Sequence, residues 1–474
     1  MMQIVLEMPE GLKAVGEAVE AMVSQIAAAW RSTGGSQAVA YTEIEEQLAA
    51  GAAAIERAGH QAILQGLDVD QPRVRIDGKV YGAVGRYAAT YYTLAGPVEV
   101  TRTLYREVGQ RNAKTVNAVS LRAGAVDERW LPGVAQAMAY LLQQGTAREA
   151  EATARVLGRV PYARGSFERV GQTLGAQYIG RQADIEAELS QEYELPPEAV
   201  SVSVALDRVS LPMEEAGPEA EPQQASAHPA RRVVRQFRMA YCATVTMHDG
   251  EGQALHTLRY GRMPQGDIEQ LCAGLAAEVR TLLRKRPTLQ VVLLADGAPE
   301  LWTHLEQALN KKTLGVPVRR LVDLWHLLEK LGKAATVLYG ETRASTELQT
   351  WRLRLLNRWQ TLGEIWAELQ RSGQQHRVVG ASRPVHEAIT YLENHRMEMN
   401  YAAARKRGLP VGSGNVEATC KSLVALRMKR PGARWKEETG EQVLQLRALA
   451  LSDRWEPAMR LILRPLRKAV RIAA

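Results

Sequence analysis

The chain has 474 residues, of which 46% are hydrophobic and 24% charged, a balance typical of globular proteins with room for about two to four domains. A formal net charge of +8 and a pI of about 9.3 favour an anionic partner, most simply nucleic acid. Three scattered cysteines without a Cys-x-x-Cys pair argue against a zinc ribbon or a disulfide framework. With no signal-peptide pattern and no apolar run of about 18 residues, we expect a cytoplasmic, nucleoid-associated protein without membrane contact.

The first two regions differ in their patterns. Residues 1–75 are rich in Ala, and apolar side chains recur at helical spacing between 10 and 66, which predicts two or three helices. Residues 76–125 contain aromatic and β-branched side chains on both sides of Gly96 and Pro97. This arrangement predicts a β-hairpin.

Residues 126–195 have the pattern of three short helices. The first spans 132–144, the second opens with a capping box of Thr146 and Glu149, and Ser166 can cap the third. Such helices with tight turns indicate either a helix-turn-helix or a purely structural bundle. In a helix-turn-helix, the third helix would offer DNA a polar face that includes Arg164, Arg169 and Gln172.

Residues 196–474 are predicted to form an α/β domain with a mixed sheet. The segment 201–209 alternates as a strand, with Asp207 on the face opposite Leu206. Residues 213–235 are rich in Pro and charge and predict a flexible loop. The later elements are strands at 237–247 and 254–261 joined by a turn at 248–250, a helix at 266–285, a strand at 291–295, a helix, and a strand at 318–322.

This β-β-β-α-β-α-β order is that of a ribonuclease H-like domain. Residues 327–405 are amphipathic and poor in strand patterns, and predict an all-helical insertion. Basic C-terminal helices are expected over 414–474.

Asp296 follows the wholly apolar run 291–295. A carboxylate at the end of a buried strand lies where α/β sheets place ligands. Alternatively, Asp296 caps the helix that begins near Pro299.

In a ribonuclease H-like sheet, the first strand, the end of the fourth strand and a late helix converge, and Asp207, Asp296 and Glu417 occupy these places. Asp249 and Glu214 are less suitable than Asp207, because they fall in the predicted turn and loop. Glu417 shares a helical row with Cys420, Val424 and Met428, which predicts that it faces the sheet. Alternatively, it forms a local ion pair with Lys421.

Three converging carboxylates can hold two divalent ions for phosphoryl transfer, and hard oxygen ligands favour Mg²⁺ or Mn²⁺. The segment 405–436 contains nine Lys or Arg residues and a single acid, Glu417, so it is suited to a phosphate backbone. Trp435 can stack on an unpaired base or pack beneath the last helix. The predicted DNA-contacting residues here are Lys421, Arg427, Lys429, Arg430, Arg434, Trp435 and Lys436.

Four segments together resemble the ISKra-type insertion-sequence transposases of bacteria. They are Tyr-Tyr-Thr-Leu-Ala-Gly-Pro-Val-Glu-Val (91–100), Val-Ser-Val-Ala-Leu-Asp-Arg-Val-Ser-Leu-Pro-Met (202–213), Leu-Leu-Ala-Asp-Gly-Ala-Pro-Glu-Leu-Trp (293–302) and Gly-Ser-Gly-Asn-Val-Glu-Ala-Thr-Cys-Lys (412–421). The resemblance covers most of the chain and is strongest from about 200 to 450. It implies a DDE transposase that cuts at terminal inverted repeats and joins the freed 3′ ends to target DNA, with Asp207, Asp296 and Glu417 as catalytic residues.

Asp323-Leu-Trp-His326 is also similar to the Cys/Asp-x-x-His motif that precedes the helical insertion of Mutator-like and related DDE transposases. His326 would contact the scissile phosphate or a flipped base, and Asp323 would orient its imidazole. The alternative is that Asp323 only caps the next helix while His326 packs in the core.

Three functions remain open from the sequence. The first is an active transposase, which binds double-stranded DNA at the element ends and target and assembles as a homodimer or larger complex. The second is a domesticated helix-turn-helix regulator without catalysis. The third is a ribonuclease H-like nuclease that acts on branched DNA or hybrids.

Overall fold

A computed structural model describes residues 7–34, 38–216, 233–375 and 383–473, and it divides into two compact units. Unit 1 consists of Met1–Gly180 together with Glu456–Ala474, and unit 2 is Arg181–Trp455. The sequence-based division placed residues 181–195 with the helix-turn-helix-like region and 456–474 with the catalytic domain. The contacts instead assign the first segment to unit 2 and the second to unit 1.

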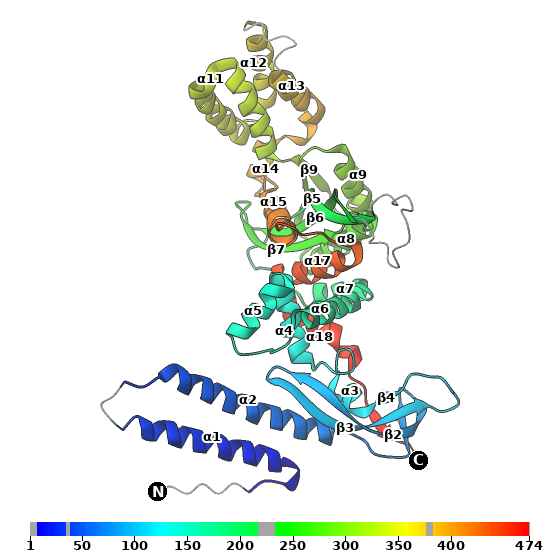
Figure 1. Ribbon diagram of the computed structural model, residues 1–474. Helices are drawn as coiled ribbons and strands as arrows, with labels where there is room; N and C mark the ends of the chain where they lie inside the picture. Colours follow the sequence, from blue (N-terminus) through cyan, green and yellow to red (C-terminus); the bar gives the residue numbers. More distant parts are fainter. Residues whose placement is uncertain (1–6, 35–37, 217–232, 376–382, 474) are drawn as a thin grey trace, which may run out of the picture. The chain divides into compact units, whose positions relative to one another are not determined.

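Unit 1 opens with helices α1 (Lys13–Ser32) and α2 (Tyr41–Gly66), which pack side by side (Figure 1). Gly51 allows this packing, because a Cβ there would lie 2.3 Å from the Met22 sulfur. Of the two or three helices predicted here, two are present as long helices, and the short 3-10 helix η1 (Glu10–Leu12) precedes them.

A five-stranded sheet follows in the order β10-β1-β2-β3-β4. Its centre is the predicted hairpin, in which Thr93 pairs with Gly96 at the turn. The C-terminal β10 pairs with β1 through Val74 and Ile472, which is why the chain's last residues belong to unit 1. The strands are β1 (Arg73–Ile76), β2 (Lys79–Thr93), β3 (Gly96–Glu107), β4 (Val116–Asn117) and β10 (Val470–Ile472), and helix α3 (Ala118–Ala123) follows β4.

Three helices complete the main part of unit 1: α4 (Pro132–Gln144), α5 (Ala147–Val156) and α6 (Arg164–Ile179). They pack through buried side chains that include Phe167 and Leu174. The predicted cap of the third helix is wrong: α6 starts at Arg164 after an extended Ala163, so Ser166 lies inside the helix.

The capping box of α5 is present as predicted. Thr146 Oγ1 accepts a hydrogen bond from Glu149 N at 3.2 Å, and Glu149 Oε2 accepts one from Thr146 N at 2.7 Å. We expect Thr146→Ala to lower the free energy of unfolding by about 1 kcal/mol, because the cap is lost. Thr146→Ser should retain most of it. Denaturant unfolding of both variants checks this, and equal losses would show that the methyl group matters rather than the cap.

Unit 2 is built on a second five-stranded sheet, with strand order β7-β6-β5-β8-β9. β5, β6 and β7 are antiparallel neighbours, whereas β8 and β9 run parallel to β5. Numbered from the first strand of the domain this is 3-2-1-4-5, which confirms the predicted ribonuclease H-like mixed sheet. The strands are β5 (Ser201–Ala216), β6 (Val233–His248), β7 (Ala254–Arg262), β8 (Gln290–Ala295) and β9 (Val318–Val322).

The predicted loop 213–235 is partly wrong. β5 and β6 continue as a long antiparallel hairpin out to the pair Ala216↔Val233. Met213 is buried at its base, and Arg238 of β6 pairs with Glu215 of β5 at 2.7 Å. The remaining part of the predicted loop, 217–232, lies outside the described residues.

The two faces of this sheet have separate cores. Leu206 and Leu293 face a large core shared with α8 (Ile268–Lys285) and α9 (Pro299–Ala308). Ala205 and Leu294 face a smaller core that includes Leu423 from the C-terminal helices. Helix α7 (Gln182–Glu192) packs on α8, and the short α10 (Lys311–Leu314) precedes β9.

The insertion after β9 is helical, as predicted, although its first helix already begins at Leu324. Trp351 is fully buried among these helices, and Gly340, with φ of 76°, kinks the first of them. The elements are α11 (Leu324–Asn357), α12 (Thr361–Gln375), α13 (Arg383–His395), the 3-10 turn η2 (Arg396–Glu398) and α14 (Tyr401–Lys406).

The C-terminal helices return to the sheet. α15 and the following π-helical turn contact β5 and β6, and α17 packs on β7 (Figure 1). No helix among the described residues is long and apolar enough to cross a membrane. The elements are α15 (Gly414–Thr419), the π-helical turn η3 (Cys420–Ala425), α16 (Leu426–Met428), α17 (Glu437–Leu451), α18 (Trp455–Leu463) and the 3-10 turn η4 (Arg464–Leu466).

Candidate active site

Three aspartates lie in one row across the parallel part of the sheet. The β5–β8 register pairs Ala205 with Leu294, so two residues further on it aligns Asp207 with Asp296. The β8–β9 register pairs Ala295 with Val322, and its next step aligns Asp296 with Asp323. Three adjacent parallel strands therefore each bring an aspartate to one row. Asp296 and Asp323 directly follow the last residues of β8 and β9, and Asp207 lies within the longer β5. The carboxyl ends of β8 and β9 are at the edge where open α/β sheets bind ligands.

The same row faces one side of the sheet. Successive side chains on a strand alternate, and Ala205, Leu294 and Leu321 belong to the smaller core. Two residues beyond each of them lie Asp207, Asp296 and Asp323, which this alternation directs to the same side. This side is covered by α15 and η3, the helical segment that begins just before Glu417.

Asp207 is anchored between its own strand and that helical segment. Its Oδ1 accepts a hydrogen bond from Arg208 N at 2.6 Å, and its Oδ2 accepts one from Cys420 Sγ at 3.5 Å. Cys242 next to Cys420, burial and the charge of Asp207 raise the pKa of the Cys420 thiol, so it stays protonated as the donor. Asp249, by contrast, lies in the β6–β7 turn at the other end of β5, and Glu214 lies in the distal part of the hairpin.

Asp296 sits in a tight turn between β8 and α9. Its Oδ1 accepts a hydrogen bond from Ala298 N at 2.9 Å, whereas the N-cap residue of α9 is Ala298 itself. No hydrogen bond reaches Asp296 Oδ2 from the part of the chain that the structure describes. Gly297 has φ of 96°, and a Cβ there would lie 3.1 Å from both Tyr391 and His395. One carboxylate oxygen thus holds the turn and the other is available to a ligand.

Glu417 is more exposed than predicted. Its side chain is 51% exposed, although Val424 and Met428 of the same predicted row are buried. The π-helical turn at Cys420–Ala425 interrupts the regular helical row, so Glu417 comes to the edge of the packed face. Among the described residues it forms no ion pair with Lys421; its Oε1 lies 3.7 Å from His326 Nδ1 instead.

The Asp323 carboxylate is fully buried and connects the start of α11 to the segment before α15. Its Oδ1 accepts hydrogen bonds from Trp325 N at 2.5 Å and His326 N at 3.1 Å, which caps α11. Its Oδ2 accepts from both the backbone N and the hydroxyl of Ser413, in the segment that leads into α15. Burial favours the neutral acid, but the donors of His326 and Ser413 prevail and the pKa of Asp323 is lowered. Through these hydrogen bonds Asp323 fixes the start of α11 and the segment before α15 relative to each other.

His326 lies among the acids and is half-buried. The neighbouring Asp323 carboxylate raises the pKa of His326 to about 9, burial opposes this, and the charges of Glu417 and Asp296 add to it. The Nδ1 atom is buried, 3.7 Å from Asp323 Oδ1, and has no hydrogen-bond partner. At neutral pH the ring is a cation beside the carboxylates.

The distances between the predicted site residues differ from pair to pair. Within the described ranges, the ligand atoms of Asp323, His326 and Glu417 lie within 4.8 Å of one another, whereas Asp207, Asp296 and Glu417 do not form such a group. Asp207 and Asp296 are neighbours by strand register. Asp207 also contacts Cys420, which follows Glu417 by three residues in the same helical segment. Open carboxylate oxygens on Asp296 and Glu417 are the hard donors that suit Mg²⁺ or Mn²⁺.

Two positioning residues were not identified from the sequence. Ser413 binds Asp323, and Tyr391 donates from its hydroxyl to the backbone oxygen of Asp296 at 2.7 Å. The neighbouring Gly412 could have drawn attention to Ser413 in the sequence, because glycines often occur where another group approaches the backbone closely. A Cβ on Gly412 would lie 2.9 Å from the Trp325 ring. Tyr391, in the middle of an amphipathic helix, carried no such signal.

The predicted DNA-contacting residues of the basic segment divide into two groups. Arg427 is 5% exposed and lies over the Trp435 ring at 5.0 Å, and the indole nitrogen donates to Met428 O at 2.9 Å. Trp435 is therefore packed, as in the alternative to base stacking, but its backbone pairs with Met213 of β5, a contact that was not predicted from the sequence. Arg427 is packed with it. Arg430 is half-buried. Four basic residues are exposed: Lys421, Lys429, Arg434 and Lys436.

In unit 1, Arg164 and Arg169 are exposed on α6, and Gln172 is half-buried. Arg169 lies 5.9 Å from the centre of the Trp130 ring. The face expected to read DNA thus retains two accessible cations.

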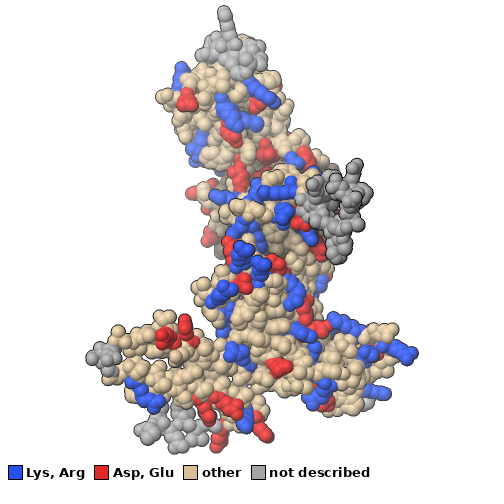
Figure 2. Space-filling model, in the orientation of Figure 1, with Lys and Arg blue, Asp and Glu red and all other residues tan. Residues whose placement is uncertain are grey.

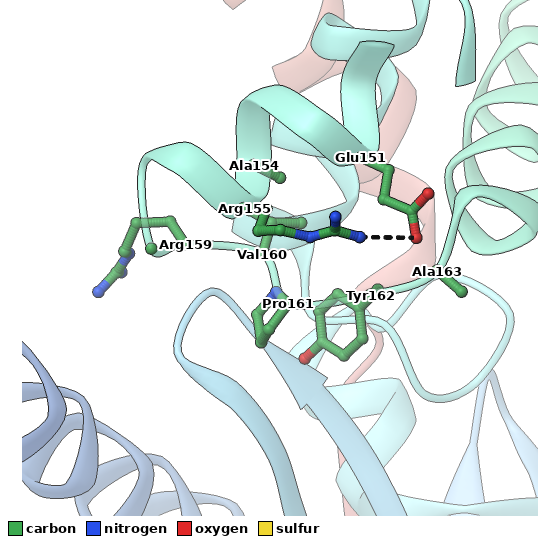
Figure 3. Close-up of a pocket in the computed structure, with 9 residues that line it drawn as sticks. Glu151, Ala154, Arg155, Arg159, Val160, Pro161, Tyr162 and Ala163 are labelled. Carbon is green, nitrogen blue, oxygen red and sulfur yellow. Dashed lines mark ion pairs between the residues drawn. The ribbon is translucent and has the colours of Figure 1, made fainter. Parts of the chain in front are cut away.

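Unit 1 also has a hollow of about 380 Å³ between α5 and the segment that leads to α6 (Figure 3). Its cations are already neutralised: Arg155 pairs with Glu151 at 3.9 Å and Arg159 with Glu56 at 2.6 Å. The rest of its wall is largely apolar, for example Val160 and Pro161. This hollow lacks the groups for catalysis or anion binding.

No family model matches the chain, and no curated protein matches it. The solved structures that resemble it include two transposase complexes. One is described as the Drosophila P element transposase strand transfer complex, at 11% identity and a TM-score of 0.35, covering 69% of this chain and 92% of that one. The other is a pre-cleavage Mos1 transpososome, at 10% identity and a TM-score of 0.15, covering 84% and 99%. Such low TM-scores carry no weight for function, and the fold assignment rests on the strand order.

Proposed function

We propose that this protein is a DDE transposase that cuts DNA at the ends of an insertion sequence and joins the 3′ ends to target DNA. The observation that carries the proposal is the alignment of Asp207 and Asp296 on adjacent parallel strands, on the side covered by the helix of Glu417. The basic charge of the chain and the resemblance of its motifs to ISKra-type transposases support the same function.

In this proposal Asp207, Asp296 and Glu417 hold two Mg²⁺ or Mn²⁺ ions. When bound, such ions activate a water or 3′-hydroxyl nucleophile and stabilise the leaving oxygen of the phosphodiester. The residues fit this role because Asp296 Oδ2 and the exposed Glu417 carboxylate are open to a ligand. The turn at Gly297 keeps the Asp296 carboxylate fixed at the end of β8.

His326 and Asp323 have auxiliary roles. His326, with its pKa raised to about 9 chiefly by Asp323, supplies a positive charge next to Glu417 where a phosphate oxygen can be received. Asp323 holds the start of α11 and the segment before α15 in one position. It is therefore a positioning residue.

The DNA contacts of the proposal come from two places. The helices α4 to α6, with Arg164 and Arg169, would bind the element ends, and exposed cations after Glu417, such as Lys421 and Lys429, would bind the backbone near the acids. Joining two ends to one target calls for two copies of the chain, so a homodimer or larger assembly is expected on DNA.

The test uses purified full-length protein with a duplex that carries the inverted repeats flanking its gene. We expect nicking at the 3′ end and strand transfer in Mg²⁺ or Mn²⁺, and neither product in EDTA. A hybrid and a Holliday junction are the comparison substrates. Specific end binding without cleavage in either metal would favour the non-catalytic regulator, and preferred cleavage of the comparison substrates would favour a nuclease.

A further inference from the structure

A second hollow, of about 290 Å³, lies in unit 2 beside the edge strand β9 and has a basic wall. Arg319 from β9 and Arg407, just after α14, provide its charges. Leu321, Ala404 and Leu409 line its inner side and belong to the smaller core.

These two arginines are unneutralised. Within the described ranges, neither guanidinium has a carboxylate within 4.0 Å, and burial, followed by the charge of Arg407, lowers the pKa of Arg319. The neighbouring Arg320 differs: it pairs with Glu306 at 2.6 Å and Glu398 at 3.1 Å. The two like charges repel each other, and an anion bound between them would offset that repulsion.

Asn400 adds a donor to the same hollow. Its Oδ1 is used to cap α14 through Ala403 N at 3.1 Å, so its amide NH₂ remains to donate. Two guanidinium groups and one amide, without an acceptor-rich wall, are complementary to a phosphate group.

The hollow lies on the same side of the sheet as the row of aspartates. Side chains alternate along β9, so Arg319, Leu321 and Asp323 face the same side of the sheet. Four residues of strand separate Arg319 from Asp323, or about 13 Å. Figure 2 shows further Lys and Arg side chains on the visible face of unit 2 around the sheet and α15.

We propose that Arg319, Arg407 and Asn400 form a binding site for one backbone phosphate of the DNA substrate, on the side of the sheet that carries the acids and about 13 Å along β9 from Asp323. The site rests on the proposed function for the identity of its ligand. It fixes the register of the duplex across the acids but does not recognise its sequence, since phosphates carry none.

The test measures the affinity of the full-length protein for a 20-base-pair duplex as a function of salt. The logarithm of the binding constant K falls linearly with the logarithm of the salt concentration, so the slope is negative. We expect Arg319→Ala/Arg407→Ala to reduce the magnitude of this slope by about one, since one phosphate contact is lost. Arg407→Ala alone, at an exposed position, should give a partial decrease even if the double variant folds poorly. Arg319→Lys/Arg407→Lys should retain most of the slope.

The matched control is Lys311→Ala/Lys312→Ala, which removes two exposed charges from α10, the helix packed on α8 at the opposite face of the sheet. It should leave the slope unchanged. An equal slope change in the control and the Arg variants would overturn the site as general charge loss. Titration with inorganic phosphate at constant ionic strength is the second arm. Phosphate binding that the Arg variants lose, with unaltered duplex affinity, would assign the hollow to free phosphate and overturn the DNA contact.

Failure of this site is distinguishable from failure of the proposed function. If the wild-type protein cuts and joins transposon ends while the Arg variants keep its salt slope, only the phosphate site is wrong. If the wild-type protein binds no duplex, both are wrong.

Discussion

Replacing Asp296 with Asn should abolish cleavage and strand transfer while the protein stays folded. The Asn side chain retains an oxygen that can accept the hydrogen bond from Ala298 N, so the turn before α9 persists. It removes the negative charge and one hard ligand for the divalent ions. A loss of about 4 kcal/mol of transition-state stabilisation corresponds to a decrease of about 1,000-fold in rate.

The measurement is single-turnover strand transfer in Mg²⁺ and Mn²⁺, together with duplex affinity and thermal unfolding. Asp249→Asn is the matched control, because it makes the same chemical change in the β6–β7 turn, where Asp249 Oδ1 accepts from Glu251 N and Gln253 N. We expect it to retain activity. Full strand transfer by Asp296→Asn would show that the catalytic assignment is wrong.

The second large effect is expected for Asp323→Ala. This change leaves four donors without their acceptor: two backbone N–H groups at the start of α11, and the N–H and hydroxyl of Ser413. Because Asp323 is fully buried, water cannot replace it freely, and a loss of about 3–5 kcal/mol of unfolding free energy is expected. Denaturant unfolding followed by tryptophan fluorescence measures this loss.

Asp267→Ala provides the comparison. Asp267 caps α8 through Gln270 N at 2.9 Å but is exposed, so its loss should cost about 1 kcal/mol. If Asp323 also positions His326, the substitution should change a property other than stability. In folded Asp323→Ala, the pKa of His326 should fall from about 9 toward its ordinary 6.5, because Asp323 is the main cause of the increase. NMR titration of the ring measures it. An unchanged pKa of His326, or equal losses of unfolding free energy in Asp267→Ala and Asp323→Ala, would contradict the positioning role of Asp323.

Local patterns in the sequence predicted much of the fold. The capping box at Thr146, the hairpin turn at Gly96 and the apolar strand before Asp296 each involve residues only a few positions apart, so propensity and periodicity specify them. The ribonuclease H-like strand order followed from these elements in sequence. It also placed Asp207 and Asp296 on neighbouring strands, as the register shows.

The errors involve helix geometry and long-range contacts. A regular helical row predicted a buried Glu417, but a π-helical turn ends that regularity and leaves the carboxylate exposed. The sequence left Trp435 either to stack on an unpaired base or to pack beneath the last helix, and it predicted neither the backbone pairing with Met213 nor the position beside the hairpin. Neither outcome is encoded within a window of a few residues.

The sequence by itself determined which acids the chain has and which strands and helices carry them, because periodicity and end signals act over short distances. Only the tertiary structure decided how these acids are used. Asp323 meets Ser413 across the whole helical insertion, and β10 returns to pair with β1. Such contacts depend on how distant segments pack and on which buried polar groups must find partners, so no local pattern could predict them.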